Sequence, residues 1–196
     1  MSETVGMGRV EAFSDGVIAI IITIMVLELK VPHGADPALL LGIWPVLLSY
    51  ALSFLMIAIY WVNHHNLLHQ SRRATTVVLW CNMFWLFCLS LIPFATAYMG
   101  ENRFTPFSTA LYAAVLLLTG IAYVPMRAAI AAQSKGEAAY ELLWTRAARK
   151  NYLSVALYAA AVPLAFVHPA IALTLAFAVA AIYFIPNAWL GGRSAG

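Results

Sequence analysis

Long apolar segments alternate with short polar connections along the whole chain. Six apolar segments stand out, bounded by charged residues, prolines or histidines, at residues 13–31, 38–62, 74–99, 107–132, 152–167 and 170–190. A helix of about 20 residues crosses the roughly 30 Å of hydrocarbon in a bilayer. Most of the segments reach that length, so the pattern predicts six transmembrane helices with very little protein outside the membrane.

Composition supports the same interpretation. The chain has 196 residues, of which 63% are hydrophobic and 10% are charged, whereas soluble domains contain about 25% charged residues. So few charges cannot cover the surface of a soluble globule of this size. No connection is long enough to form a separate domain, and we therefore expect a single all-α membrane domain over residues 1–196, surrounded by lipid.

The positions of lysine and arginine predict the orientation. With six spans, both termini and the even-numbered connections share one side, and this side carries nine of the eleven basic residues. The positive-inside rule then places both termini in the cytoplasm. The net charge of +3 is explained by these loops, and the sequence contains no basic patch interleaved with aromatic residues that would indicate a nucleic-acid partner. The nine residues are Arg9, Arg72, Arg73, Arg127, Lys135, Arg146, Arg149, Lys150 and Arg193.

The first apolar segment has an unusual pattern. Between residues 16 and 27, only Thr23 has a side chain that can form hydrogen bonds. At 100° per residue, Ile20, Thr23, Ile24 and Leu27 fall with Gly16 within an arc of about 100°. The periodicity alone fits two interpretations of this stripe, namely packing against neighbouring helices and lining of a pore.

Asp15 lies on the opposite face of this helix from Ile20. Its position predicts that it points into the subunit. Together with Ser14, it resembles a helix N-terminus, where an acidic residue is favourable. Arg9 is a candidate ion-pair partner for Asp15.

The residues at the start of the first segment form a specific motif. Residues 9–16 read R-V-E-A-F-S-D-G, with Arg9, Phe13, Ser14 and Asp15 as its characteristic members. Later stretches read W-V-N-H-H at residues 61–65 and S-L-I-P-F at residues 90–94. The chain closely resembles prokaryotic members of the transmembrane protein 175 family, the endolysosomal potassium channel family, over essentially its whole length.

The resemblance implies a potassium channel of the bacterial inner membrane. Prokaryotic members of the family assemble as tetramers of six-helix subunits, with the first helix lining a central pore. Their constriction consists of hydrophobic side chains, and the match places it at Ile20, with Thr23, Ile24 and Leu27 as the following layers. The resemblance also implies modest selectivity for potassium over sodium, without the backbone filter of sequence T-V-G-Y-G. Potassium is then the permeant ion, and no cofactor is expected.

The polar residues of the motif have a different implied role. In the family, the arginine, serine and aspartate join a hydrogen-bond network near the cytoplasmic end, which corresponds here to Arg9, Ser14 and Asp15. His64, His65 and Asn82 are expected partners, chosen by their depth in the second and third segments. The resemblance implies that this network fixes the tilt of the first helix and has little direct contact with ions.

Other groups of polar residues carry less information. His65 and His69 have the i, i+4 spacing of some zinc sites, but no acidic residue or cysteine lies near them in the sequence, so no metal site is predicted. Glu137, Glu141, Arg146 and Lys150 fit a solvated helix at the membrane surface. No combination of nucleophile and base appears, and the chain is not expected to be an enzyme. A small secondary transporter and a non-conducting membrane assembly protein remain as alternatives.

Overall fold

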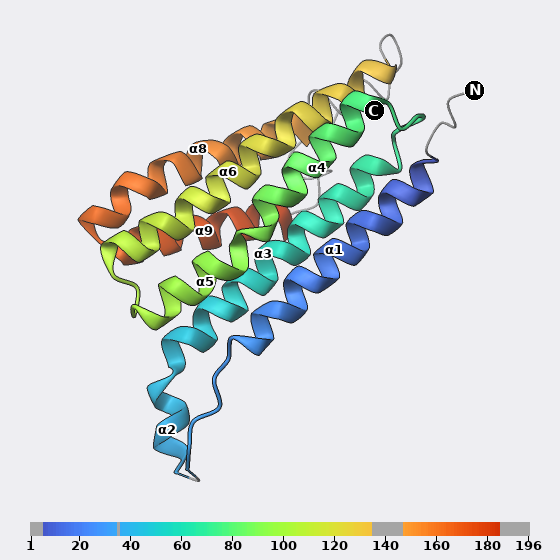
Figure 1. Cartoon of the computed structure of the whole chain (residues 1–196). Helices are drawn as coiled ribbons and strands as arrows, with labels where there is room; N and C mark the ends of the chain where they lie inside the picture. Colours follow the sequence, from blue (N-terminus) through green and yellow to red (C-terminus); the bar gives the residue numbers. More distant parts are fainter. Residues whose placement is uncertain (1–5, 35, 135–146, 185–196) are drawn as a thin grey trace, which may run out of the picture.

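The computed structural model describes residues 6–34, 36–134 and 147–184, and the regular structure in these ranges is helical. Figure 1 shows long helices stacked side by side, with the short helix α2 projecting at one end. The elements are α1 (Met7–Leu27), α2 (Pro37–Gly42), α3 (Trp44–Leu68), α4 (Thr76–Ser90), α5 (Ile92–Glu101), α6 (Pro106–Ala131), η1 (Ala132–Ser134), α8 (Ala147–Val167) and α9 (Pro169–Phe184).

Five helices are long and apolar enough to cross a membrane, counting α4 and α5 as one span over Thr76–Glu101. A sixth apolar helix, Pro169–Tyr183, is shorter. The prediction of an all-helical membrane protein is therefore confirmed. The end of the sixth predicted segment, residues 185–190, lies outside the described residues, as do Glu137, Glu141 and Arg146 of the predicted surface helix.

The helix α1 lies at one edge of the bundle, as Figure 1 shows, and packs against α3, α4 and α5. At the other side, α6, α8 and α9 pack closely together. Long side chains such as Trp85, Met56 and Leu116 fill the space between the helices and are fully buried. One face of α1 thus belongs to the core of the subunit, while the rest of the helix lies at its periphery.

Two predicted boundaries are wrong in a way that concerns the site. The helix α1 begins at Met7, six residues before the predicted start, and Gly6 occupies its N-cap. Ser14 and Asp15 therefore lie inside the helix and do not cap it. The helix α3 continues to Leu68 rather than ending at residue 62. In both cases polar residues continue the helix, and Glu11 of the one extension meets His65 of the other.

A third correction concerns Lys150. It lies within α8 and is buried, with its ammonium group 5.7 Å from the centre of the Tyr183 ring. The sequence predicted a solvated position because the apolar run begins only after Asn151. A lysine near a helix end can bury its methylene groups and place its charge over an aromatic face.

The third predicted span is interrupted at Leu91, which separates α4 from α5. Pro93 lies in the first turn of α5, where a missing backbone N–H is tolerated. By contrast, Pro125 and Pro163 lie inside continuous helices. The break at Leu91 lies where α5 approaches α1 and α3.

Hydroxyl groups connect three helices in the middle of the bundle. The Thr96 hydroxyl oxygen lies 2.7 Å from Oγ of Ser53, and Oγ of Ser53 lies 3.0 Å from the hydroxyl oxygen of Tyr112. These residues belong to α5, α3 and α6, and all three side chains are buried. A buried hydroxyl without a partner is costly, so this chain of hydrogen bonds favours one arrangement of the three helices.

Lys30, in the segment after α1, pairs with Glu101, the last residue of α5, at the end of the bundle near α2. The Lys30 ammonium lies 2.8 Å from Oε1 of Glu101, and this carboxylate raises the pKa of Lys30. Both side chains are largely exposed, so solvent screens the pair. Its main effect is to place the segment that follows α1 beside the end of α5.

Candidate functional site

The residues of α1 separate into two faces. Ser14, Ile18, Ile21 and Met25 are buried within the subunit, together with Val10. The stripe predicted from the sequence lies on the other side, where Ile20 is 58% exposed, Ile24 43% and Leu27 79%. These three large apolar side chains are therefore directed away from the body of their own subunit.

Thr23 lies within this exposed stripe. Its hydroxyl group donates a hydrogen bond of 3.0 Å to the carbonyl oxygen of Ile20 in the same helix. Because a hydroxyl has a single hydrogen, the Thr23 oxygen retains lone pairs that can accept from water or bind a cation. The stripe thus combines bulky apolar groups with one oxygen ligand.

A groove runs beside the stripe, between α1 and the break between α4 and α5. Its residues are almost all apolar, and Glu28 stands at one end. The groove places one flank of the stripe beside aromatic and proline side chains of α5. Its main lining residues are Val17, Ile20, Ile24, Pro93, Phe94 and Ala97.

On the buried face of α1, Ser14 belongs to a hydrogen-bond network with α3 and α4. The Asn82 amide donates to Oγ of Ser14 at 2.9 Å, and Oδ1 of Asn82 lies 2.7 Å from Nε2 of His64. Ser14 in turn donates to the carbonyl oxygen of Val10 at 2.8 Å. All three polar side chains are fully buried, and the His64 ring stacks on Trp85 with centroids 4.6 Å apart.

This arrangement defines the direction of each hydrogen bond. Since the Asn82 amide nitrogen donates to Ser14, its oxygen must accept, and His64 carries its proton on Nε2. His64 of α3 therefore donates to Asn82 of α4, and Asn82 donates to Ser14 of α1. The network holds the buried face of α1 in one orientation relative to two neighbouring helices.

Asp15 makes a separate contact. Its carboxylate accepts a hydrogen bond of 2.8 Å from Nε1 of Trp61 on α3. Asp15 thus points toward another helix of its own subunit, on the side predicted from the periodicity. Arg9 is exposed and forms no ion pair with Asp15 or any other described residue.

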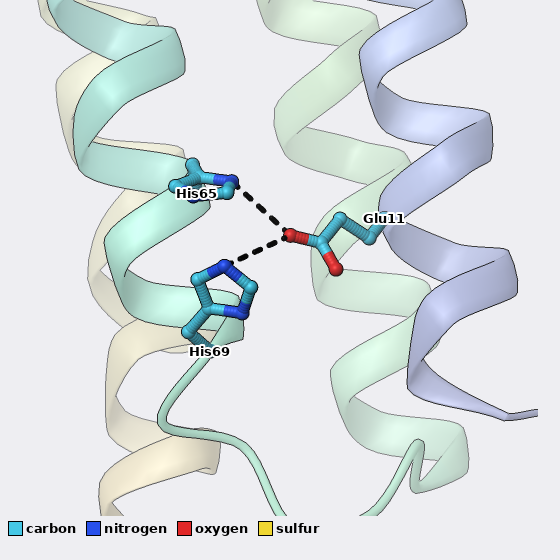
Figure 2. A group of neighbouring side chains, drawn as sticks. All are labelled: Glu11, His65 and His69. Atoms are coloured by element: carbon cyan, nitrogen blue, oxygen red, sulfur yellow. Dashed lines mark ion pairs between the residues drawn. The ribbon is translucent and has the colours of Figure 1, made fainter.

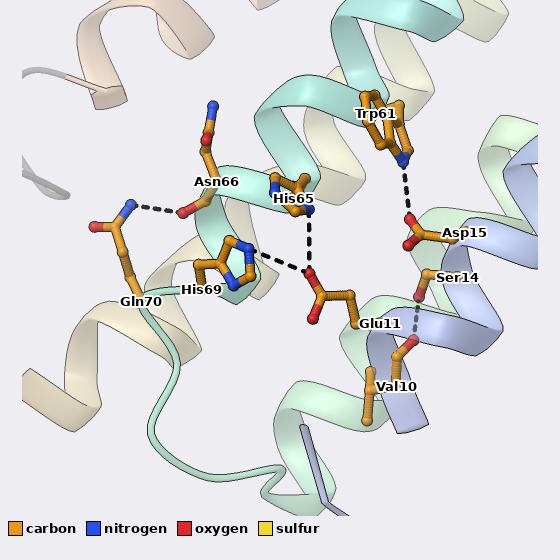
Figure 3. A network of polar contacts seen from close by, with 9 residues as sticks. All are labelled: Val10, Glu11, Ser14, Asp15, Trp61, His65, Asn66, His69 and Gln70. Atoms are coloured by element: carbon orange, nitrogen blue, oxygen red, sulfur yellow. Dashed lines mark hydrogen bonds and ion pairs between the residues drawn. The ribbon is translucent and has the colours of Figure 1, made fainter. Parts of the chain in front are cut away.

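One turn before Asp15, Glu11 lies against His65 of α3 and His69 at the C-cap of that helix, as Figures 2 and 3 show. Its Oε1 atom is 3.1 Å from Nδ1 of His65 and 3.6 Å from Nε2 of His69. The structure therefore brings His64 and Asn82 to Ser14, but places His65 in a different cluster. Phe13 is exposed and takes part in neither.

Sequence reasoning missed Glu11 and the partner of Asp15. A signal was present, because Glu11 and Asp15 are four residues apart on one helix, and Trp61, His65 and His69 repeat at the same interval. Residues four apart share a helix face. The rows meet because α3 runs antiparallel to α1 after the connection that contains α2.

Taken together, the apolar helices and the two-faced α1 define a multi-pass α-helical membrane protein. Comparisons with known proteins specify its family. The family model described as "Endosomal/lysosomal potassium channel TMEM175" matches residues 9–93. A potassium channel of Chryseobacterium sp. (strain P1-3) is 41% identical over 92% of this chain and 93% of its own length. The chain belongs to the TMEM175 family, as the sequence motif predicted.

A solved structure supports the fold. The crystal structure of a lysosomal potassium-selective channel TMEM175 homolog from Chamaesiphon minutus superposes with a TM-score of 0.81 at 27% identity, over 92% of this chain and 97% of that one. The zebrafish endosomal/lysosomal proton channel TMEM175 is 33% identical over 52% of this chain, but this match covers only 22% of the animal protein. These relatives are ion channels, and the prediction that the chain is not an enzyme is confirmed.

Proposed function

We propose that four copies of this chain form a potassium-selective cation channel, with α1 of each copy lining a central pore. The bacterial relatives are named potassium channels, and the matching crystal structure is of a potassium-selective channel. In this proposal the chain acts as one domain in a bacterial inner membrane, with both termini in the cytoplasm. Potassium is the permeant ion, and no cofactor takes part.

The observation that carries the proposal is the exposed stripe on α1. Ile20, Ile24 and Leu27 repeat at helical spacing and are directed away from their own subunit, whereas the opposite face of the helix is buried. In a fourfold assembly, α1 helices around a common axis would bring these side chains together as rings. The apolar groove beside the stripe offers a surface against which a neighbouring subunit can pack.

Ile20 is proposed as the narrowest ring. Four isoleucine side chains around an axis form a hydrophobic constriction, and such constrictions control conduction by excluding water. An ion must lose part of its hydration shell to pass. Potassium loses water at a lower cost than sodium, so a constriction of this kind favours potassium to a modest degree.

Thr23 follows Ile20 by three residues and supports the passage of the dehydrated ion. Its hydroxyl hydrogen is engaged by the Ile20 carbonyl oxygen, which leaves the oxygen lone pairs of each copy free to accept. Four such oxygens would replace part of the lost hydration. Ile24 and Leu27 then form the next apolar layers of the pore.

The polar contacts of α1 with its neighbouring helices are proposed to fix the position of this lining. The network of Ser14, Asn82 and His64 holds one face of the helix, and the Asp15–Trp61 hydrogen bond holds it against α3. Because these contacts hold the inner face of α1 in place, the four Ile20 side chains would lie at the same level and form one ring. These residues are proposed to position the pore without touching the ion.

The test is a recording from purified protein in planar bilayers under a potassium-to-sodium gradient. We expect unitary currents with a reversal potential displaced toward the potassium equilibrium. Ile20→Ala and Ile20→Asn should change conductance or selectivity while the tetramer persists on size-exclusion chromatography. Ile121, an isoleucine of α6 with similar exposure, provides the matched controls Ile121→Ala and Ile121→Asn, which should leave both properties unchanged.

Other results would contradict the proposal. Unchanged currents in both Ile20 variants would show that Ile20 does not form the constriction. Saturable flux without unitary currents would indicate a secondary transporter. Electrical silence of inserted, tetrameric protein would indicate a non-conducting assembly protein.

A further inference from the structure

The three side chains of Glu11, His65 and His69 form a cluster that the pore does not use. One imidazole from α3, one from the C-cap of that helix and one carboxylate from α1 converge, with one ligand atom from each within 4.8 Å of the others. Figure 2 shows both rings turned toward the same carboxylate oxygen. We propose that this cluster is a binding site for a divalent transition metal ion, with Zn²⁺ as the ion that fits best.

The types of ligand support a transition metal. Imidazole nitrogen binds zinc, copper and nickel well, whereas magnesium and calcium prefer sites made of oxygen atoms. Two histidines and one glutamate also form the three-ligand set of several zinc sites, in which water completes the tetrahedron. The i, i+4 spacing of His65 and His69 places both rings on one helix face.

The distances between the ligand atoms suit the same ion. A tetrahedral zinc ion with ligands at about 2.0–2.1 Å separates them by roughly 3.3–3.4 Å. In the structure, Oε1 of Glu11 lies 3.1 Å from Nδ1 of His65 and 3.6 Å from Nε2 of His69. These two separations bracket the ideal value. The two ring nitrogens lie within 4.8 Å of each other, and an approach of the two rings would complete the geometry.

The cluster is also reachable. The side chain of Glu11 is 25% exposed, that of His65 37% and that of His69 59%. By contrast, His64 is fully buried in the Asn82 network and unavailable to an ion from solution. A metal ion can therefore enter from the end of the subunit at which α1 begins, and an open side remains for a water ligand.

A simple hydrogen-bonded cluster is the competing interpretation. In that case neutral His65 and His69 would both donate to Glu11, with protons on Nδ1 and Nε2. Metal binding requires those same nitrogens to be unprotonated, so the protons move to the other nitrogen of each ring. The two interpretations thus differ in whether the cluster captures a metal.

A bound ion would connect α1 to α3 one turn before the Asp15–Trp61 contact. Both helices contribute ligands, so the ion would be bound only when they are packed as in this structure. Zinc should therefore stabilise the folded assembly, since a ligand of the native state alone raises its stability.

The experiment measures Zn²⁺ binding to the full chain, purified in detergent without a histidine tag, by isothermal titration calorimetry. We expect one Zn²⁺ per chain. Because changes in outer-shell partners already weaken metal affinity about 10–100-fold, Glu11→Gln, His65→Gln and His69→Gln should each weaken binding at least tenfold. His33→Gln and His168→Gln, which change exposed histidines of other connections, serve as matched controls and should bind as the unaltered protein does.

A second readout protects the test against variants that assemble poorly. Co²⁺ bound in place of Zn²⁺ should give the visible absorption of a tetrahedral site, and this absorption should be lost in the three variants while they elute as the native assembly. Zn²⁺ should also raise the melting temperature of the unaltered protein but not that of His65→Gln. Absence of binding, or equal binding in the three variants and the controls, would overturn the proposal. Binding is measured without recording currents, so its failure is distinct from failure of the proposed channel function.

Discussion

Asn82 and His64 are joined by a hydrogen bond of 2.7 Å between two fully buried side chains on different helices. Asn82 uses its other amide atom to bond Ser14 of α1. A single asparagine thus connects three helices, and its position in the middle of the network makes it the most sensitive of the three residues to substitution.

Replacing Asn82 with leucine, which has a similar volume, should destabilise the protein. The change leaves Nε2 of His64 without an acceptor and Oγ of Ser14 without its donor. An unsatisfied buried polar group costs about 1–3 kcal/mol, and for a chain of this size each kcal/mol lowers the melting temperature by about 2–4 °C. Thermal unfolding of the purified protein, followed by loss of the native elution peak, measures the effect.

Asn102→Leu is the matched control for that experiment. Asn102 is exposed at the C-cap of α5, and its side-chain amide donates to the backbone carbonyl of Tyr98, so its replacement should change the melting temperature by no more than about 2 °C. A similar loss in both variants would show that the buried network contributes nothing specific.

Thr23→Val should reduce conductance or selectivity for potassium without changing assembly. Valine has nearly the shape of threonine but lacks the oxygen that is proposed to face the ion. Thr174→Val provides the control, because Thr174 is also an exposed threonine whose hydroxyl bonds a carbonyl of its own helix, at 2.8 Å. Reversal potentials under a potassium-to-sodium gradient compare the two, and equal values would exclude Thr23 as an ion ligand.

Gly100→Ala should separate α5 from α3. A Cβ atom at Gly100 would meet the Ser49 hydroxyl and would lie 2.9 Å from the Cα atom of Val46. A backbone atom cannot move aside as a flexible side chain can, so we expect a loss of about 1–3 kcal/mol, as for other overpacked sites. Gly8→Ala on α1, where nothing lies within 4 Å, should be neutral or slightly stabilising. The melting temperatures of the two variants test this prediction. An unchanged melting temperature for Gly100→Ala would show that close contact at Gly100 does not contribute to stability.

The sequence was sufficient for the class of fold and for the exposed face of α1. Apolar segments of membrane length are a direct consequence of the thickness of the hydrocarbon, and the periodicity of Ile20, Thr23 and Ile24 selected side chains that are exposed in the structure. Helix ends were harder to predict, because a hydropathy pattern places the end of a helix at the first polar residues. Arg9 and Glu11 belong to α1, and His65 belongs to α3.

The partners of the polar residues could be predicted only in part. Depth along the helices was enough to associate His64 and Asn82 with Ser14, since all three lie near the same end. Depth could not separate His65 from that group, because adjacent residues on a helix point about 100° apart. That rotation directs His64 into the core and His65 toward Glu11.

Substitutions are tolerated most easily where a side chain faces lipid, because any apolar residue of similar size is equivalent there. The helix α1 has one face inside its own subunit, and its other face is the proposed pore lining. In the proposed assembly, most residues of α1 from Ser14 onward would face either their own subunit or the pore, and little of that stretch would meet lipid. This stretch of the first helix would then have less room for neutral drift than a helix face in contact with lipid.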